Sequence, residues 1–277
     1  MVAQRYVSLF NLPKHVKFTF VEKNILDKNI SDIIKNVEVV IHLAAITDAN
    51  SSFDRVKEIE ETNYLGTKNI IEACLHSNAK LFFPSTTSVY GKQQRMVDEE
   101  CLENDLKPQS PYAKYKLESE KMIHHYGETQ GLKFVICRFG TIFGTSIGMR
   151  FHTAVNKFCL QAVTGRSLTI WKTAMDQKRP YLGLNDAVNS IKFFINKNIF
   201  NNRVYNILSS NNTVKEIFNI IRKTIPDVKY DFVESEIMNQ LSYKVSNQLV
   251  RGEGFVFKDK IDAGIDETLS LLDTLQN

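Results

Sequence analysis

The stretch LFFPSTTSVYG, residues 81–91, joins a short apolar strand to a cluster of hydroxyl side chains. In parallel sheets, substrates meet the carboxyl ends of the strands. Thr86 therefore lies where its hydroxyl can hydrogen-bond a reacting oxygen. The alternative for residues 85–88 is a polar cap between a strand and a loop, with no part in chemistry.

Strands and helices alternate on both sides of this stretch. Apolar runs predict strands, and apolar positions at helical spacing predict helices. The strands are expected at 16–21, 37–43 and 134–137, and the helices at 28–36, 53–77 and 111–130. This alternation is typical of a parallel α/β sheet with helices on both faces.

The pattern loosens after Gly144. Helices are expected at 150–164, 185–196 and 258–275 and from a capping box at Thr213 and Glu216, with strands at 168–171 and 204–208. We therefore expect residues 1–145 to form the main α/β domain. Residues 146–277 are expected to form mainly a smaller lobe that binds substrate, with some segments returning to the first domain.

Composition limits the classes of protein that fit. The 277 residues carry a net charge of +4, dispersed along the chain, which gives no indication of a nucleic-acid partner. No apolar run approaches the ~18 residues of a membrane span. The four cysteines lack C-x-x-C spacing and the six histidines lack metal-binding spacing. We expect reduced thiols, a cytoplasmic location and no metal site.

Tyr112-Ala-Lys-Tyr-Lys116 places a tyrosine and a lysine on one face of a helix that Ser110 and Pro111 begin. A cation beside a tyrosine lowers a pKa that starts near ~10. Such a tyrosine can act as general base on an alcohol. The spacing also occurs at Tyr64 and Lys68, and either pair can simply lie on a solvated helix face.

These motifs together resemble the extended short-chain dehydrogenases/reductases, in particular the NAD-dependent nucleotide-sugar epimerase/dehydratase family. The resemblance covers nearly the whole chain from about Phe18. It rests on Val40-Ile-His-Leu-Ala-Ala45, Asn63 with Gly66-Thr67, residues 85–91 and 108–116, Arg138 with Gly144, and residues 179–186. The resemblance implies a Rossmann-type doubly wound parallel sheet with a smaller C-terminal α+β substrate lobe.

The resemblance assigns roles to particular residues. The implied catalytic residues are Thr86, Tyr112 and Lys116. The implied NAD-binding residues are Asn24, Ile25, Leu43, Ala44, Ala45, Asn63, Tyr112 and Lys116, with Asn24 standing where relatives have an acidic residue. The implied substrate-binding residues are Thr86, Thr141, Asn156 and Arg179, with the arginine meeting a nucleotide diphosphate. For His42 we expect only a packed strand histidine.

The implied chemistry is epimerisation of a nucleotide-diphosphate sugar through a transient keto sugar. Thr87-Ser88 replaces the Asp-Glu pair of the dehydratases, which disfavours dehydration. A reductase or dehydratase of the same family and a non-catalytic, truncated sugar-nucleotide-binding remnant stay open as alternatives. The resemblance also implies a homodimer through a four-helix bundle of helices 53–77 and 111–130.

One family motif is not found. The first glycine is Gly66, so the glycine-rich turn expected after the first strand is absent. We expect that a first β–α–β unit of ~30–40 residues is missing. The strand at 37–43 would then keep an open edge, and the pyrophosphate would lose its helix N-terminus. The chain alone is therefore expected to bind NAD poorly and to fold marginally.

Overall fold

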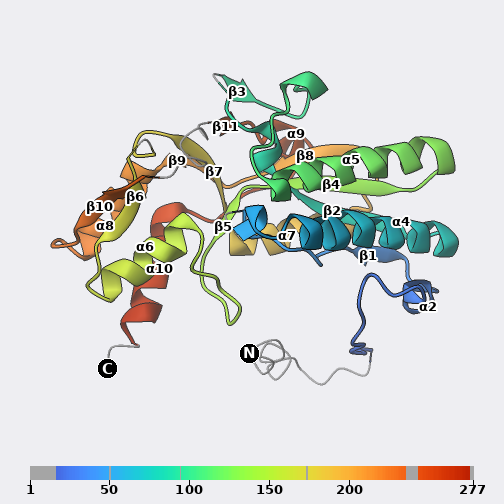
Figure 1. The fold of residues 1–277 in the computed structure, drawn as a ribbon, viewed down its shortest axis with the longest axis horizontal. Coiled ribbons are helices and arrows are strands. Elements are labelled where there is room, and N and C mark those ends of the chain that lie inside the picture. Colours follow the sequence, from blue (N-terminus) through green and yellow to red (C-terminus); the bar gives the residue numbers. More distant parts are fainter. Residues whose placement is uncertain (1–16, 50, 94, 173, 235–242, 275–277) are drawn as a thin grey trace.

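The computed structural model describes residues 17–274 apart from 50, 94, 173 and 235–242. Its main sheet has four parallel strands in the order β1, β2, β4, β8. These strands span Val39–Ile41, Lys80–Thr86, Phe134–Phe139 and Arg203–Ile207. The order and the parallel pairing, with helices on both faces (Figure 1), confirm the Rossmann-type fold.

Alternate residues of β2 enter two separate cores. Leu81 and Phe83 pack with helices α4 (Gly66–Ser77) and α5 (Pro111–Gln130), whereas Phe82 packs against α7 (Leu184–Asn196). Successive side chains of a strand point to opposite faces, so a continuous apolar strand needs helices on both sides. The predicted two-sided burial is therefore confirmed.

Helix α5 begins and ends where its capping residues predict. Ser110 accepts a hydrogen bond from the Ala113 N–H at 3.2 Å, Pro111 occupies the first turn, and Gly131 ends the helix with φ 76°. The helix predicted at 53–77 divides into three segments. They are α3 (Val56–Ile59), the π-helical segment η2 (Glu60–Leu65) and α4.

The second lobe has its own core. It contains the sheet β5–β7–β9, the parallel pair β6 and β10, and helices α6, α8 and α10 packed in one cluster. The strands span Thr141–Phe143, Lys178–Gly183, Ser210–Thr213, Leu168–Trp171 and Tyr230–Val233, and the helices span Ala154–Val163, Val214–Thr224 and Ile261–Asp273. The Thr213–Glu216 capping box is confirmed at α8.

Later segments return to the main sheet. Helix α7, strand β8 and helix α9 (Gln248–Gly252) contribute to its second core. The remaining elements are short: α2 (Ile30–Ile34), β3 (Met96–Val97) paired with β11 (Lys244–Val245), and the 3-10 turns η1 (Ser51–Phe53), η3 (Thr87–Tyr90) and η4 (Glu103–Asp105). The domain boundary at residue 145 stays a prediction.

The strand predicted at 16–21 is wrong where the structure describes it. Residue 16 lies outside the described residues, and residues 18–23 form no regular element. Phe18, Phe20 and Val21 are about half exposed. Alternating apolar residues make a strand only when a neighbour pairs with the backbone, and no such pairing occurs within the described ranges.

Strand β1 lies at the edge of the described sheet, with β2 as its neighbour. The strand spans fewer residues than the predicted range 37–43, and Leu43, which follows it, is 62% exposed. The open edge expected here is thus found among the described residues. Weak NAD binding and marginal folding stay predictions.

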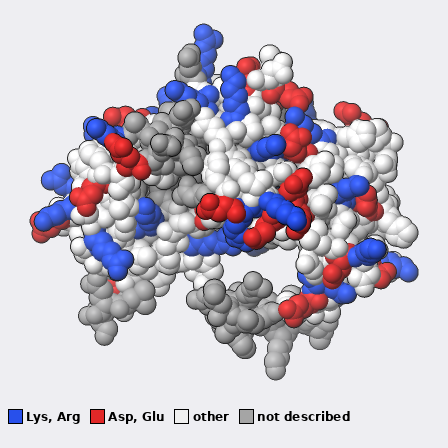
Figure 2. Space-filling model, in the orientation of Figure 1, with Lys and Arg blue, Asp and Glu red and all other residues white. Residues whose placement is uncertain are grey.

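On the face shown in Figure 2, positive and negative side chains intermingle, in line with their dispersal along the sequence. Of the helices in the described ranges, none is both long and apolar enough to cross a membrane.

Candidate active site

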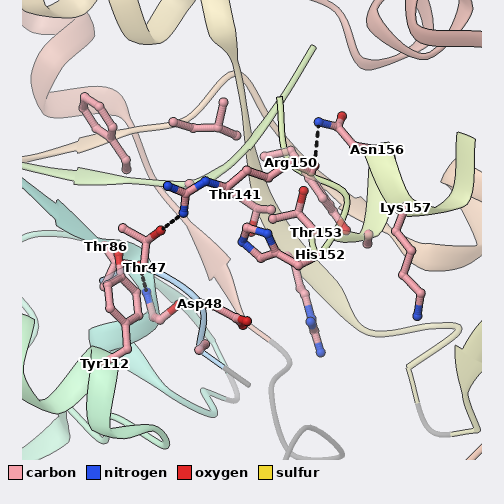
Figure 3. Close-up of a pocket in the computed structure, with 18 of the residues that line it drawn as sticks. Thr47, Asp48, Thr86, Tyr112, Thr141, Arg150, His152, Thr153, Asn156 and Lys157 are labelled. Atoms are coloured by element: carbon pink, nitrogen blue, oxygen red, sulfur yellow. Dashed lines mark hydrogen bonds between the residues drawn. The ribbon is translucent and has the colours of Figure 1, made fainter. Parts of the chain in front are cut away.

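A cavity of about 520 Å³ opens beyond the carboxyl ends of β1, β2 and β4. The main sheet and α5 supply one wall, which includes Thr86 and Tyr112. The loop after β5 and helix α6 supply the other wall, which includes Arg150 and Asn156. Figure 3 shows these two groups on opposite sides of the cavity.

Thr86 and Tyr112 meet at the centre of the first wall. Thr86 is the last residue of β2, and its Oγ1 accepts a hydrogen bond from the Ser88 N–H at 3.1 Å. Burial raises the pKa of Tyr112 to about 12, although its hydrogen bond with Thr86 acts in the opposite direction. The sequence therefore correctly predicts that these two side chains come together.

Lys116 lies one helical turn beyond Tyr112 and also lines the cavity. Its Nζ donates to the Pro84 carbonyl at 2.8 Å and lies 4.4 Å from the centre of the Phe83 ring. Burial lowers the pKa of Lys116 to about 8, against the opposing effect of the Glu120 charge. The predicted lowering of the Tyr112 pKa is wrong in this structure, because the desolvation of the phenol outweighs its favourable contacts.

The second Tyr-x-x-x-Lys copy has no such surroundings. The exposed Lys68 pairs with Glu72 at 3.7 Å along α4, and Tyr64 packs against Tyr115 with ring centres 6.3 Å apart. Neither Tyr64 nor Lys68 lines the cavity. The solvated helix face is therefore the correct interpretation of this copy.

Asn63 supports the loop that follows β1. Its side-chain amide donates to the Ile46 carbonyl at 2.9 Å and accepts from the Ile46 N–H at 2.8 Å. Leu43 and Ala45 line the cavity from this loop. Ala44, between them, is exposed and is not among the residues that line it.

Asn24 and Ile25 lie outside the cavity. The Asn24 N–H donates to Asp27 at 3.3 Å, and the Asn24 side chain accepts from the Leu26 N–H at 3.0 Å. Ile25 packs against Gly66 at the start of α4. The structure does not bring this pair to the catalytic candidates.

The predicted substrate residues gather on the lobe side. Thr141 and Arg179 line the cavity, and the Arg179 guanidinium lies 5.6 Å from the centre of the Trp171 ring. Asn156 is buried, and its Nδ2 donates to the Arg150 carbonyl at 3.1 Å. All three therefore face the same space as Tyr112.

The sequence analysis missed several residues that line the cavity, namely Thr47, Asp48, Arg150, His152 and Lys157. The Arg150 Nη1 donates to the Thr47 hydroxyl at 2.7 Å, which joins the two walls. Burial lowers the pKa of His152, with the Asp48 charge opposing the shift. Most of these residues belong to irregular segments, where no periodicity signals which side chains face inward.

The described residues contain no group of three or more His, Cys, Asp or Glu side chains that could hold a metal ion. The side chains that line the cavity include hydroxyls, amides, cations, the imidazoles of His42 and His152, and the carboxylate of Asp48.

The cavity thus brings a tyrosine and a lysine on one helix to a hydroxyl at a strand end of a Rossmann-type sheet. Residues 1–207 match the model of the NAD dependent epimerase/dehydratase family. The chain belongs to this family, which confirms the resemblance drawn from its motifs.

Curated relatives include sugar-nucleotide enzymes. The chain is 33% identical over 192 residues to an uncharacterized UDP-glucose epimerase of Bacillus subtilis, covering 69% of this chain and 59% of the relative. It is 29% identical over 225 residues to a dTDP-D-glucose 4,6-dehydratase of Dictyostelium discoideum, covering 75% and 51%. The chain thus matches little more than half the length of these relatives.

Solved structures share the fold over almost the whole chain. The UDP-glucuronic acid 4-epimerase of Bacillus cereus, with UDP-glucuronic acid and NAD bound, matches with a TM-score of 0.86 and 23% identity over 99% of this chain and 87% of its own. A UDP-N-acetylglucosamine 4-epimerase of Methanobrevibacter ruminantium matches with a TM-score of 0.84 and 22% identity over 96% and 86%.

Proposed function

We propose that this chain is an NAD-dependent epimerase of a nucleotide-diphosphate sugar. The observation that carries the proposal is the convergence of Thr86, Tyr112 and Lys116 on one wall of a cavity whose opposite wall carries Arg150 and Arg179. The first wall suits proton transfer with an alcohol. The second wall suits a diphosphate, because guanidinium groups match phosphate geometry. The epimerases among the structural neighbours are consistent with this assignment.

The residues present fit the nicotinamide-ribose half of NAD. Leu43, Ala45 and Pro84 give an apolar wall, and Lys116 and Tyr112 offer a buried donor and a hydroxyl on the same side. Gly66 packs against Ile25 and does not cradle a phosphate. When bound, NAD would supply a carbon that accepts and returns a hydride.

The protein side chains would handle the proton. Tyr112 would take the proton of the sugar hydroxyl, and Thr86 would donate a hydrogen bond to the reacting oxygen. Because burial raises the pKa of Tyr112, this transfer depends on every contact that favours tyrosinate. A Lys116 ammonium would be such a contact, and the Thr86 hydrogen bond is one only while its hydroxyl hydrogen is not donated to the sugar oxygen.

Epimerisation is favoured over dehydration by the residues that follow Thr86. Thr87 is buried, and its hydroxyl donates to the Phe139 carbonyl at 3.3 Å, so it is a packing residue. Among the described residues that line the cavity, Asp48 is the one carboxylate, and it lies on the loop after β1. No acidic pair adjoins Thr86 to protonate a departing hydroxyl.

The test compares Tyr112→Phe with Tyr64→Phe, since Tyr64 belongs to the surface copy of the motif. Each purified protein is incubated with NAD and either UDP-glucose or UDP-glucuronic acid, and products are identified by NMR. We expect a 4-epimer, with kcat at least about 100-fold lower in Tyr112→Phe and unchanged in Tyr64→Phe. A 4-keto-6-deoxy product would assign the chain to the dehydratases, and binding of UDP without turnover would assign a non-catalytic role.

A further inference from the structure

Three successive residues at the end of β2 are each bonded to one of three successive turns of α5. The Lys116 Nζ donates to the Pro84 carbonyl at 2.8 Å, the Ser85 hydroxyl donates to Glu120, and Thr86 bonds with Tyr112. Positions four apart lie on one face of a helix. Tyr112, Lys116 and Glu120 therefore form a continuous seam that fixes the strand end against the helix.

Glu120 lies behind the cavity, where it cannot touch a ligand. It is 2% exposed and is not among the residues that line the cavity. The Arg138 guanidinium pairs with its carboxylate through Nη2 at 2.6 Å and Nε at 3.1 and 3.2 Å. Arg138 itself is 5% exposed and stacks on the Tyr90 ring at 4.8 Å.

A buried ion pair is weak evidence for a stabilising role. Apolar residues of similar volume often replace such pairs without loss of stability, because the desolvation of two charges offsets their attraction. The surroundings of Glu120 suggest another use. Lys116 is a second buried cation, one turn before Glu120 on α5, and the Glu120 charge acts on it as well as on Arg138.

The other ionisable groups around Lys116 do not replace this carboxylate. His42 directly follows β1 and is kept neutral by burial, which lowers its pKa to about 3. Tyr112 on α5 holds its proton because burial raises its pKa. Arg138 on β4 pairs with Glu120 and, as a cation, cannot supply the negative charge that favours an ammonium.

We propose that Glu120 is a positioning residue: its carboxylate fixes Ser85, and hence the Thr86 end of β2, and its charge keeps the buried Lys116 an ammonium beside Tyr112. The consequence for turnover rests on the proposed epimerase function. The consequence for Lys116 does not, because it concerns the protein alone.

The test follows the Lys116 Nζ by heteronuclear NMR as a function of pH, with the signal assigned through Lys116→Arg. In Glu120→Gln we expect the midpoint of Lys116 to fall by about one pH unit or more, because the desolvated ammonium loses its anionic neighbour. Glu118→Gln is the matched control, since Glu118 lies on the same helix but pairs with Lys121 at the surface. The titration midpoint of Lys116 in Glu118→Gln should equal that in the unaltered chain.

Two further variants keep the proposal open to refutation. Glu120→Gln/Arg138→Met removes both charges of the pair, so it avoids an unpaired buried arginine if the single variant does not fold. Ser85→Ala keeps the charge but breaks the bond to β2, so it should lower kcat about tenfold without moving the midpoint. Glu120→Asp keeps the negative charge, so the titration midpoint of Lys116 should stay close to that of the unaltered chain.

The outcomes separate the two proposals. A Lys116 midpoint that moves by less than about 0.3 pH unit in Glu120→Gln relative to the unaltered chain, or in the double variant relative to Arg138→Met, overturns the role of Glu120. Absence of epimerisation in the unaltered chain overturns the proposed function and leaves the lysine titration as a valid test.

Discussion

His42 shows how a single buried side chain can link the fold to pH. Thr67 donates its hydroxyl hydrogen to the Asn63 carbonyl at 2.6 Å, so the His42 Nε2, 3.0 Å from that hydroxyl, must be the donor in their contact. The ring is thus a neutral Nε2–H tautomer. Burial, with a smaller contribution from the Lys116 charge, lowers its pKa to about 3.

The first prediction concerns stability in acid. A histidine that binds its proton near pH 6.5 when unfolded but near 3 when folded favours the unfolded chain as the pH falls through this window. At pH 5 this group alone should lower the free energy of unfolding by about 2 kcal/mol relative to pH 8. Urea unfolding of His42→Gln should lack this loss.

His76→Gln serves as the control for His42→Gln, because His76 is exposed on α4 and should keep the acid sensitivity of the unaltered chain. An equal acid sensitivity in all three proteins would show that His42 is not the group responsible.

At the scale of elements, the approach to α5 depends on a glycine. Gly91 has φ 61°, and a Cβ added there would collide with the Lys107 carbonyl. Lys107 lies shortly before Ser110, which caps α5. A displaced Lys107 would therefore shift the start of the helix that carries Tyr112.

We predict that Gly91→Ala destabilises the protein by about 3 kcal/mol, through left-handed backbone strain and the collision together. Gly131→Ala is the matched control, because Gly131 also has positive φ but open space around it. It should cost about 1–2 kcal/mol. Thermal unfolding measures the loss of stability in both variants. Equal losses in Gly91→Ala and Gly131→Ala would contradict the role of the contact with Lys107.

Elements with local signals were predicted well from the sequence. Helix α5 has its Ser110–Pro111 start and its Gly131 end, and β2 has an unbroken apolar core. The segment 16–21 has the alternation of a strand, but pairing depends on a neighbour that the segment itself does not contain. Local sequence carries caps and periodicity, whereas pairing is a property of the whole sheet.

The candidate site divides in the same way. Thr86, Tyr112 and Lys116 could be brought together in advance because each lies on a regular element next to a recognisable motif. Arg150 and His152 could not, because they lie in an irregular segment between β5 and α6. The direction of the Tyr112 pKa shift could not be predicted from the sequence either, because it depends on burial, which residue spacing does not reveal.

At the scale of the whole molecule, the cavity exists because two units of structure face each other. The described part of Figure 1 has the main sheet with α4 and α5 toward one end and the lobe with α6, α8 and α10 toward the other. The Arg150–Thr47 hydrogen bond crosses between them. A ligand that contacts both walls would therefore also fix their relative position.

Outward from the sheet, the side of the molecule formed by η1, α3 and η2 carries exposed apolar side chains. Phe53, Val56 and Leu65 are each more than a third exposed, and η1, α3 and η2 all contact α5. Exposed apolar clusters on helices often mark contacts between subunits. This surface coincides with the helices through which a homodimer was predicted from the sequence.

We predict that the protein is a homodimer through this surface and that Leu65→Glu converts it to a monomer, because a two-fold interface places the new carboxylate in both halves of the contact. Leu271→Glu is the matched control: Leu271 lies on α10 in the lobe and is 45% exposed, against 44% for Leu65. Sedimentation velocity at micromolar concentration should give a dimer for the unaltered chain and for Leu271→Glu, and a monomer for Leu65→Glu. A dimer in all three proteins would place the interface elsewhere, and a monomeric unaltered chain would refute the dimer itself.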